Sequence, residues 1–160
     1  MPILLPAYEE CSRAASLSGC EIRQIIKKSA DYISGSWTYG EPSRQALSEL
    51  IGLFNECTQP NWDGYDAPAL KPQVFEYARQ FIATVPLDLP NPEISASPQG
   101  DISFEWYQGP KQIVSVGVSE SGEIHFASLS GYRRVFGSYP FDGTFDDQIY
   151  GLIHDLYEVT

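Results

Sequence analysis

Apolar residues along this chain repeat with a helical period up to about residue 84 and with a period of two from about residue 93. In the ranges 22–33 and 47–54 they recur three or four positions apart, which is typical of a helix with one buried face. A third stretch of this kind begins at Pro72, because proline is favoured in the first turn of a helix. The pattern therefore predicts three helices before the first strand.

Cap residues indicate where the first two helices begin. Ser18 and Glu21 have the spacing of a capping box, in which the hydroxyl and the carboxylate satisfy free amides of the first turn. Pro42 suits the first turn of the next helix. We expect these helices to form a hairpin over residues 18–58, preceded by a weakly patterned, loose arm at residues 1–17.

Apolar and polar residues alternate after the helices, and short turns separate the alternating runs. The runs are residues 93–96, 102–107, 113–118, 124–127 and about 132–137. Short connections make neighbouring strands antiparallel, so the runs predict a meander of four to five strands. A second capping signal, Thr144-Phe145-Asp146-Asp147, followed by an apolar stripe that ends at Leu156, predicts a last helix.

These elements predict one α+β domain over residues 1–160, in which an antiparallel β-meander carries helices on one face. A chain of 160 residues is long enough to bury roughly 70% of the surface that its unfolded form exposes. After the arm and the helical hairpin, we expect residues 61–160 to supply a helix, the meander and the C-terminal helix.

A turn-rich connector, Asn61-Trp62-Asp63-Gly64-Tyr65-Asp66-Ala67, precedes the third helix. Together with Pro72, the prolines from Pro86 to Pro92, Gly100-Asp101 and Glu105-Trp106, it resembles an uncharacterised family of small bacterial proteins. The pattern of that family runs Asn-Trp-Asp-(Ser/Gly)-Tyr-x-Ala, and it has Asp-Gly where this chain has Gly100-Asp101 in reversed order. The resemblance covers a little under half of the chain. It implies an intact soluble domain of bacterial or phage type, and it implies no reaction.

We interpret Asn61, Trp62, Asp63 and Tyr65 of this connector as a structural motif. Asn and Asp side chains can bond the local backbone, and Gly64 permits a positive φ. Trp62 and Tyr65 are expected to fold back over the seam between the third helix and the sheet. We favour this role as core anchors over a ligand-stacking platform.

The charge of the chain is strongly unbalanced. It carries 10 Lys and Arg residues against 21 Asp and Glu residues, a formal net charge of −11. This field repels phosphate backbones and anionic membranes, so the charge disfavours direct binding of nucleic acid or of a membrane. Two interpretations stay open. The acidity serves solubility alone, or it attracts a partner that has a basic surface.

Cysteine usage and the absence of targeting patterns favour the cytoplasm. Cys11, Cys20 and Cys57 have neither the even count of a disulfide framework nor the spacing of zinc ligands. No basic leader with an apolar run opens the chain, and no apolar stretch approaches the ~20 residues of a membrane span. We therefore expect a cytoplasmic protein without a metal and without a cofactor.

The sequence offers little catalytic equipment. It holds no Gly-x-Ser-x-Gly, no phosphate-binding glycine loop and no His-Glu-x-x-His. One acid–base arrangement is conceivable, because strand phase places Glu105, Glu123 and His125 on one sheet face together with Tyr107 and Ser115. We expect no catalytic residue, and we keep a small enzyme that uses the His125 face as an alternative.

The same face suits docking, because Tyr and Arg are frequent anchors of protein interfaces. The candidate binding residues are Tyr107, Tyr132, Arg133 and Arg134, with an acidic and aromatic group near the last helix formed by Tyr139, Asp142, Asp146 and Asp147. The predicted function is a non-catalytic acidic module that binds a protein with a basic surface. An inhibitor, antitoxin or immunity-type protein acting on a nucleic-acid-handling partner fits this description. A further alternative is a self-associating structural subunit, a homodimer that buries Tyr107 or Trp37.

Overall fold

The fold is described from a computed structural model of the chain, over residues 41–158. These residues belong to one compact unit, which spans residues 36–160. The predicted arm at 1–17 and the first helix of the predicted hairpin, at 22–33, lie outside the described residues. The hairpin as a whole therefore stays a prediction.

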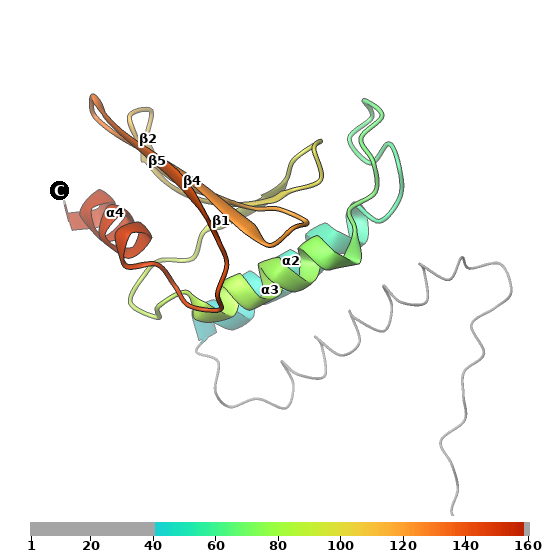
Figure 1. The fold of residues 1–160 in the computed structure, drawn as a ribbon, viewed down its shortest axis with the longest axis horizontal. Coiled ribbons are helices and arrows are strands. Elements are labelled where there is room, and N and C mark those ends of the chain that lie inside the picture. The colour runs from blue at the N-terminus through green and yellow to red at the C-terminus, as the bar shows by residue number, and fades with distance from the viewer. Residues whose placement is uncertain (1–40, 159–160) are drawn as a thin grey trace, which may run out of the picture. The chain divides into compact units, whose positions relative to one another are not determined.

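The described residues form helices and strands in the order α2, α3, β1 to β5 and α4 (Figure 1). The helices are α2 (Glu41–Glu56), α3 (Pro72–Thr84) and α4 (Asp147–Glu158). The strands are β1 (Glu93–Ala96), β2 (Ile102–Gly109), β3 (Gln112–Val118), β4 (Glu123–Ser130) and β5 (Arg133–Pro140). The predicted α+β class is confirmed, and β5 continues to Pro140 rather than ending near residue 137.

The five strands form one sheet in the order β1-β2-β3-β4-β5, and every neighbouring pair is antiparallel. The predicted meander is therefore confirmed. Its register can be followed along one row of opposed residues, Ile94, Phe104, Val116, Phe126 and Gly137. Because side chains opposite one another share a face, this row places the apolar phase of all five strands on the same side of the sheet.

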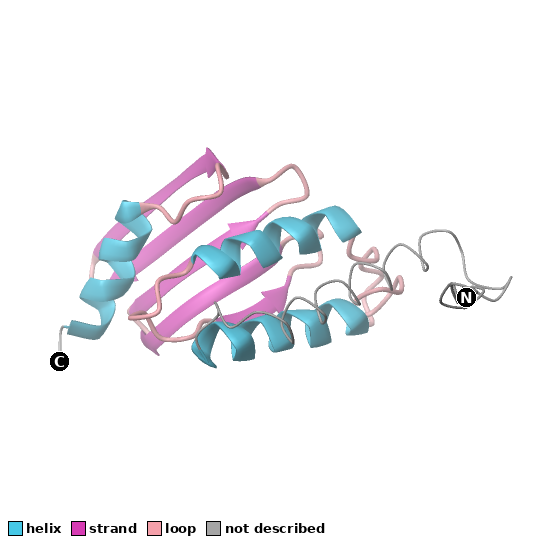
Figure 2. Cartoon of the chain, turned by 90° about the horizontal axis from the view of Figure 1, so that it is seen from below, coloured by secondary structure: helices cyan, strands magenta, loops and turns pink. Residues whose placement is uncertain are grey.

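All three described helices lie on that side of the sheet (Figures 1 and 2). Helix α2 lies beside α3 and contacts β1, α3 contacts β2 and β3, and α4 contacts β2, β3 and β4. The prediction of helices on one face is confirmed for these helices. The core between the layers includes Leu47, Leu50, Phe54, Val74, Phe75, Ala78, Phe81, Ile82, Ile102, Phe104, Trp106, Val114, Val116, Val118, Ile124, Phe126, Ile149 and Ile153.

Aromatic side chains make the closest contacts of this core. The rings of Phe81 on α3 and Phe104 on β2 have centroids 5.0 Å apart. Phe54 on α2 and Phe75 on α3 are 4.6 Å apart between centroids, which joins the two helices. Trp106 is only 1% exposed, and its Nε1–H donates to the carbonyl of Pro90 at 2.8 Å. The indole therefore fixes the proline-rich passage before β1 against the sheet.

Two glycines are required by the close approach of aromatic rings. A Cβ on Gly137 would lie 2.8 Å from the ring of Phe126, its partner across the strands. Gly122, in the turn between β3 and β4, has a φ of 78°, and a Cβ there would lie 2.7 Å from the ring of Tyr77 on α3. Such contacts need residues without a side chain. The contact at Gly122 sets how closely α3 approaches the turn between β3 and β4, and the contact at Gly137 lets the Phe126 ring lie against β5.

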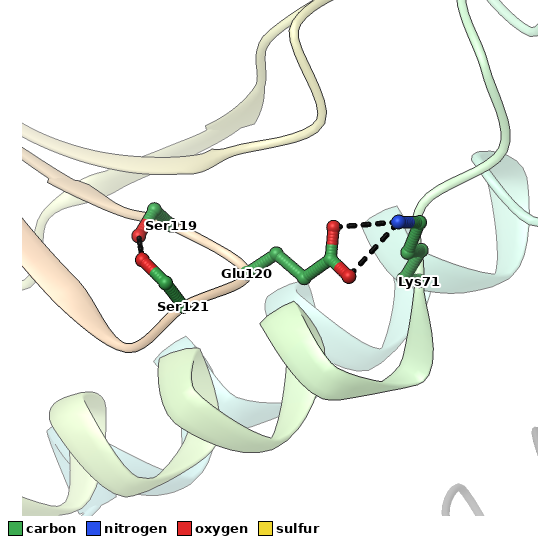
Figure 3. A network of polar contacts seen from close by, with 4 residues as sticks. All are labelled: Lys71, Ser119, Glu120 and Ser121. Atoms are coloured by element: carbon green, nitrogen blue, oxygen red, sulfur yellow. Dashed lines mark hydrogen bonds and ion pairs between the residues drawn. The ribbon is translucent and has the colours of Figure 1, made fainter.

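An ion pair joins the same turn to the start of α3 (Figure 3). Lys71 Nζ donates to both carboxylate oxygens of Glu120, at 2.9 and 2.7 Å. The side chains are 64% and 52% exposed, so solvent screens the pair and its contribution is about 0–1 kcal/mol. The contact guides the turn onto α3, while the buried aromatic residues supply most of the stabilisation.

Helix α4 begins later than the sequence predicted. The Asp146 carboxylate accepts the backbone N–H groups of Gln148 at 2.8 Å and of Ile149 at 3.1 Å, so Asp146 is the cap and the helix begins at Asp147. The predicted cap residue, Thr144, instead donates its hydroxyl to Asp142 at 2.6 Å. The prediction was wrong by two positions because the Asp142 carboxylate takes up this hydroxyl.

The separation of the two sheet faces can be tested at adjacent residues of β2. Trp106→Ala is expected to lower the free energy of unfolding by about 3–5 kcal/mol, because it removes a buried indole and leaves a cavity. Tyr107→Ala is the matched control, since Tyr107 is 54% exposed on the opposite face, and its expected cost is below about 1 kcal/mol. Chemical denaturation followed by circular dichroism measures both. Equal losses would contradict the assignment of the faces.

Candidate functional site

One face of the sheet is not covered by any described helix, and we call it the open face. The strand register assigns to it the residues that alternate with the buried ones. They are Glu93, Ser95, Ser103, Glu105, Tyr107, Ile113, Ser115, Gly117, Glu123, His125, Ala127, Leu129, Arg134, Phe136 and Ser138.

The part of the open face formed by β3, β4 and β5 is apolar and hollowed. A hollow of about 370 Å³ is lined by Ile113, Ser115, Ala127, Ser128, Leu129, Arg134, Val135 and Phe136. Ile113, Leu129 and Arg134 stand opposite one another along one row of the sheet. Phe136 is 83% exposed at the rim. Large apolar side chains gathered on a solvent-facing surface are typical of interaction sites.

Two carboxylates oppose each other at one flank of the open face. Glu93 on β1 and Glu105 on β2 are direct cross-strand partners. Like charges opposite one another destabilise a sheet, and no ion pair with a described residue relieves this pair. A cation supplied by another molecule would relieve the repulsion.

The three residues of the alternative acid–base arrangement share the open face, as the strand phase predicted, but they do not gather. His125 Nε2 lies 3.9 Å from the nearer carboxylate oxygen of Glu123, and both side chains are about half exposed. Glu105 stands on β2, two strands away from His125 on β4. The apolar hollow is lined by neither His125 nor a carboxylate.

The predicted binding residues of the strands are divided between the two sides of the sheet. Tyr107 and Arg134 lie on the open face, whereas Arg133 belongs to the opposite phase of β5. Tyr132 is 92% exposed in the turn between β4 and β5, and Lys111 Nζ lies 4.5 Å from the centroid of its ring. Of these residues, Tyr132 has a contact with Lys111, which was not predicted, whereas Tyr107 on β2 and Arg134 on β5 are separated by β3 and β4.

The four predicted residues near α4 lie in the segment that leads from β5 into this helix. Tyr139 lies on the face of the sheet that the helices cover. The centroid of its ring is 6.4 Å from the centroid of the Phe126 ring. Burial, together with the carboxylates of Asp146 and Asp142, raises the pKa of Tyr139 to about 12. Hydrogen bonds from Thr144 lower the pKa of Asp142. Asp146 caps α4 and Asp147 begins it, so three of these residues have local structural contacts.

Side-chain hydrogen bonds hold the connector between α2 and α3. Asp63 Oδ1 accepts the backbone N–H groups of Tyr65 at 2.8 Å and of Ala67 at 3.1 Å. Asn61 Oδ1 accepts the N–H of Asp66 at 2.9 Å, and Trp62 Nε1 donates to a backbone carbonyl at 2.9 Å. Asn61, Trp62 and Asp63 thus have local hydrogen bonds within the connector, and their role as a structural motif stays an interpretation.

Tyr65 departs from the prediction. We expected it to fold back over the seam between α3 and the sheet, but its side chain is 90% exposed. Asn61 and Asp66 have positive φ angles, of 63° and 74°, and Asp63 binds the N–H of Tyr65. This local geometry turns the tyrosine outward. Trp62 is half-buried.

Sequence reasoning missed the apolar hollow of the open face. It gave no role to Ile113, Leu129 or Phe136. A signal was present, because the alternation that passes through His125 and Ala127 continues to Leu129. Apolar residues in the polar phase of a half-covered sheet indicate a surface that another body covers.

Comparison of the chain with protein-family models, with curated proteins and with solved structures found no match. Among residues 41–158, no helix combines the length and the apolar character needed to cross a membrane. The same residues bring together no group of three His, Cys, Asp or Glu side chains that could hold a metal ion.

The connector can be tested through Asp63. Asp63→Ala is expected to lower the free energy of unfolding by about 1–3 kcal/mol, because two backbone N–H groups lose their acceptor. Asp66→Asn is the control that also removes one negative charge, since no hydrogen bond to the Asp66 side chain is found and Asn tolerates a positive φ. Thermal and urea denaturation compare the two variants. A loss of the same size in both would show that charge, rather than the hydrogen bonds, matters.

The environment of Tyr139 predicts a change of stability at high pH. Its folded pKa of about 12 lies above the ordinary tyrosine value of about 10. The native state therefore keeps a proton that the unfolded state loses, so this stabilisation is present below pH ~10 and is lost as the pH rises toward ~12. Tyr139→Phe should remove one late step from the ultraviolet titration of the tyrosines and flatten the fall of stability in that range. Superimposable titration curves would refute the assignment.

Proposed function

We propose that this chain is a non-catalytic module that binds another protein through the open face of its sheet. The observation that carries the proposal is the apolar hollow of about 370 Å³ over β3, β4 and β5 on this face, bounded by Ile113, Leu129 and Phe136. Its lining combines aliphatic side chains, an exposed aromatic ring and Arg134. A buried apolar centre with a polar rim is the usual anatomy of a protein interface.

The partner is proposed to present a basic surface around an apolar anchor. Residues 41–160 hold 17 of the 21 acidic residues and 6 of the 10 basic ones, so the negative charge belongs to this part of the chain. On the open face, the opposed pair Glu93 and Glu105 would gain from a Lys or Arg of the partner. An inhibitor, antitoxin or immunity-type protein in the cytoplasm that acts on a nucleic-acid-handling protein would have this chemistry.

The geometry favours binding over the acid–base alternative. His125 and Glu123 are about half exposed and lie outside the hollow. A general base is most effective where its environment is shielded from water and the substrate is held beside it. The hollow of the open face, at Ile113 and Leu129, is lined by neither a histidine nor a carboxylate.

The proposal is tested by capturing the partner with the immobilised full-length chain from a lysate of the source organism, followed by mass spectrometry. Leu129→Glu places a charge in the hollow and is expected to reduce the captured partner roughly tenfold or more. Gln80→Glu, on an exposed position of α3, adds the same charge on the helix side and should leave capture unchanged. Thermal melting of both variants verifies that they are folded.

The electrostatic part of the proposal has its own variant. Glu105→Lys removes the carboxylate pair of the flank, so it should weaken capture and reduce its dependence on salt. The proposal fails if the chain retains no protein above the level of blank beads, or if folded Leu129→Glu retains the same proteins as the wild type. In that case the open face is not the docking surface.

A further inference from the structure

Strand β5 forms an edge of the sheet, and β4 is its only strand partner among the described residues. Helix α4 packs on β2, β3 and β4 instead of covering this edge. The strand is eight residues long, whereas the opposite edge, β1, has four. A long edge strand leaves backbone N–H and C=O groups free to pair with another strand.

Only the two ends of β5 carry residues of the types that normally prevent an edge strand from pairing with another strand. Arg133 and Arg134 stand at its start, and Pro140 stands at its end. Charged residues and proline are the usual protection of an edge strand. Between them, residues 135–138 carry neither, and Phe136 at the middle of the strand is 83% exposed. The middle of the edge is therefore open to pairing.

We propose that two copies of this chain pair through their β5 strands, antiparallel and about a two-fold axis at Phe136. The two sheets would then continue into each other. This inference goes beyond the proposed function, because it concerns the edge of the sheet rather than the open face. Phe136 and Arg134 take part in both, because they line the hollow and also belong to β5.

Register selects Phe136 as the centre of the pairing. Residues opposite one another across strands share a sheet face, so a two-fold antiparallel pair must place one residue opposite its own copy. With Phe136 at the axis, Arg134 stands opposite Ser138 of the second copy, and Pro140 falls outside the ladder. An axis at Gly137 would place Pro140, which has no N–H, opposite Arg134. An axis at Val135 would bring the two Arg134 side chains close together.

The charges at the ends of β5 complement each other in this arrangement. The basic pair Arg133 and Arg134 begins the strand, and Asp142 follows its end by two positions. Antiparallel pairing places the basic end of each copy beside the Asp142 end of the other copy. The two Phe136 rings meet on the open face, where cross-strand aromatic pairs are favourable.

Cross-linking tests this register directly in the full chain with Cys11 and Cys20 replaced by Ser. Phe136→Cys is expected to form a disulfide-linked dimer under mild oxidation, because directly opposed residues lie within disulfide distance. Arg134→Cys alone and Ser138→Cys alone should not cross-link, whereas a mixture of these two variants should do so. Cross-linking of either single variant as efficiently as Phe136→Cys would overturn the register.

Sedimentation of the otherwise unmodified chain tests whether the pairing forms without a cross-link. We expect a dimer whose dissociation constant rises roughly tenfold or more in Phe136→Asp, since two carboxylates then oppose each other. Tyr65→Asp, at an aromatic position that is 90% exposed in the connector between α2 and α3, is the matched control and should leave the constant unchanged. A chain that remains monomeric at all accessible concentrations, or a dimer that is indifferent to Phe136→Asp, would overturn the proposal. The capture experiment with Leu129→Glu tests the open face separately. Failure of the proposed dimer can therefore be distinguished from failure of the proposed docking surface.

Discussion

Burial of one face of the sheet under helices is the interaction on which the rest of this structure depends. Phe104, Val116 and Phe126 stand in one row across the middle strands, and all are less than 9% exposed. A strand offers every second side chain to this layer, so burial of these residues fixes which residues must face the other way. The apolar hollow at Ile113 and Leu129 is a consequence, because these residues share the phase that the described helices do not cover.

The polar contacts of the fold lie mainly where chain segments enter or leave the helical layer. Trp106 holds the carbonyl of Pro90, Asp146 caps α4, and Lys71 reaches Glu120 at the turn between β3 and β4. Each contact fixes a connection at the boundary of the core. The hollowed part of the open face, by contrast, carries apolar side chains. The polar groups therefore position the helices without occupying the surface that we propose for binding.

Most of the described fold could be predicted from the sequence. Apolar residues repeat every three to four positions in the helices and every second position in the strands, so the two kinds of element can be told apart. Val74, Ala78, Phe81 and Ile82 recur at helical spacing, and they form one buried face of α3. The predictions failed where local hydrogen bonds compete. The cap of α4 moved to Asp146, and Tyr65 turned outward because Asp63 binds its N–H. For the candidate site, the alternation of residues was enough to predict that Glu105 and His125 share one face of the sheet. It could not predict which side chains surround the hollow, because that depends on how neighbouring strands are aligned.

Net charge and edge geometry act together on what this molecule can bind. A charge of −11 opposes contact between two copies in most orientations, because their fields repel each other. At the β5 edge the local charges differ, since Arg133 and Arg134 precede the exposed middle of the strand and Asp142 follows it. Only an antiparallel approach brings unlike charges together at both ends of the strand. In the proposed pairing, the acidity would therefore disfavour unspecific contacts of the edge while it permits one defined arrangement. The carboxylates of the open face would stay available to the proposed basic partner.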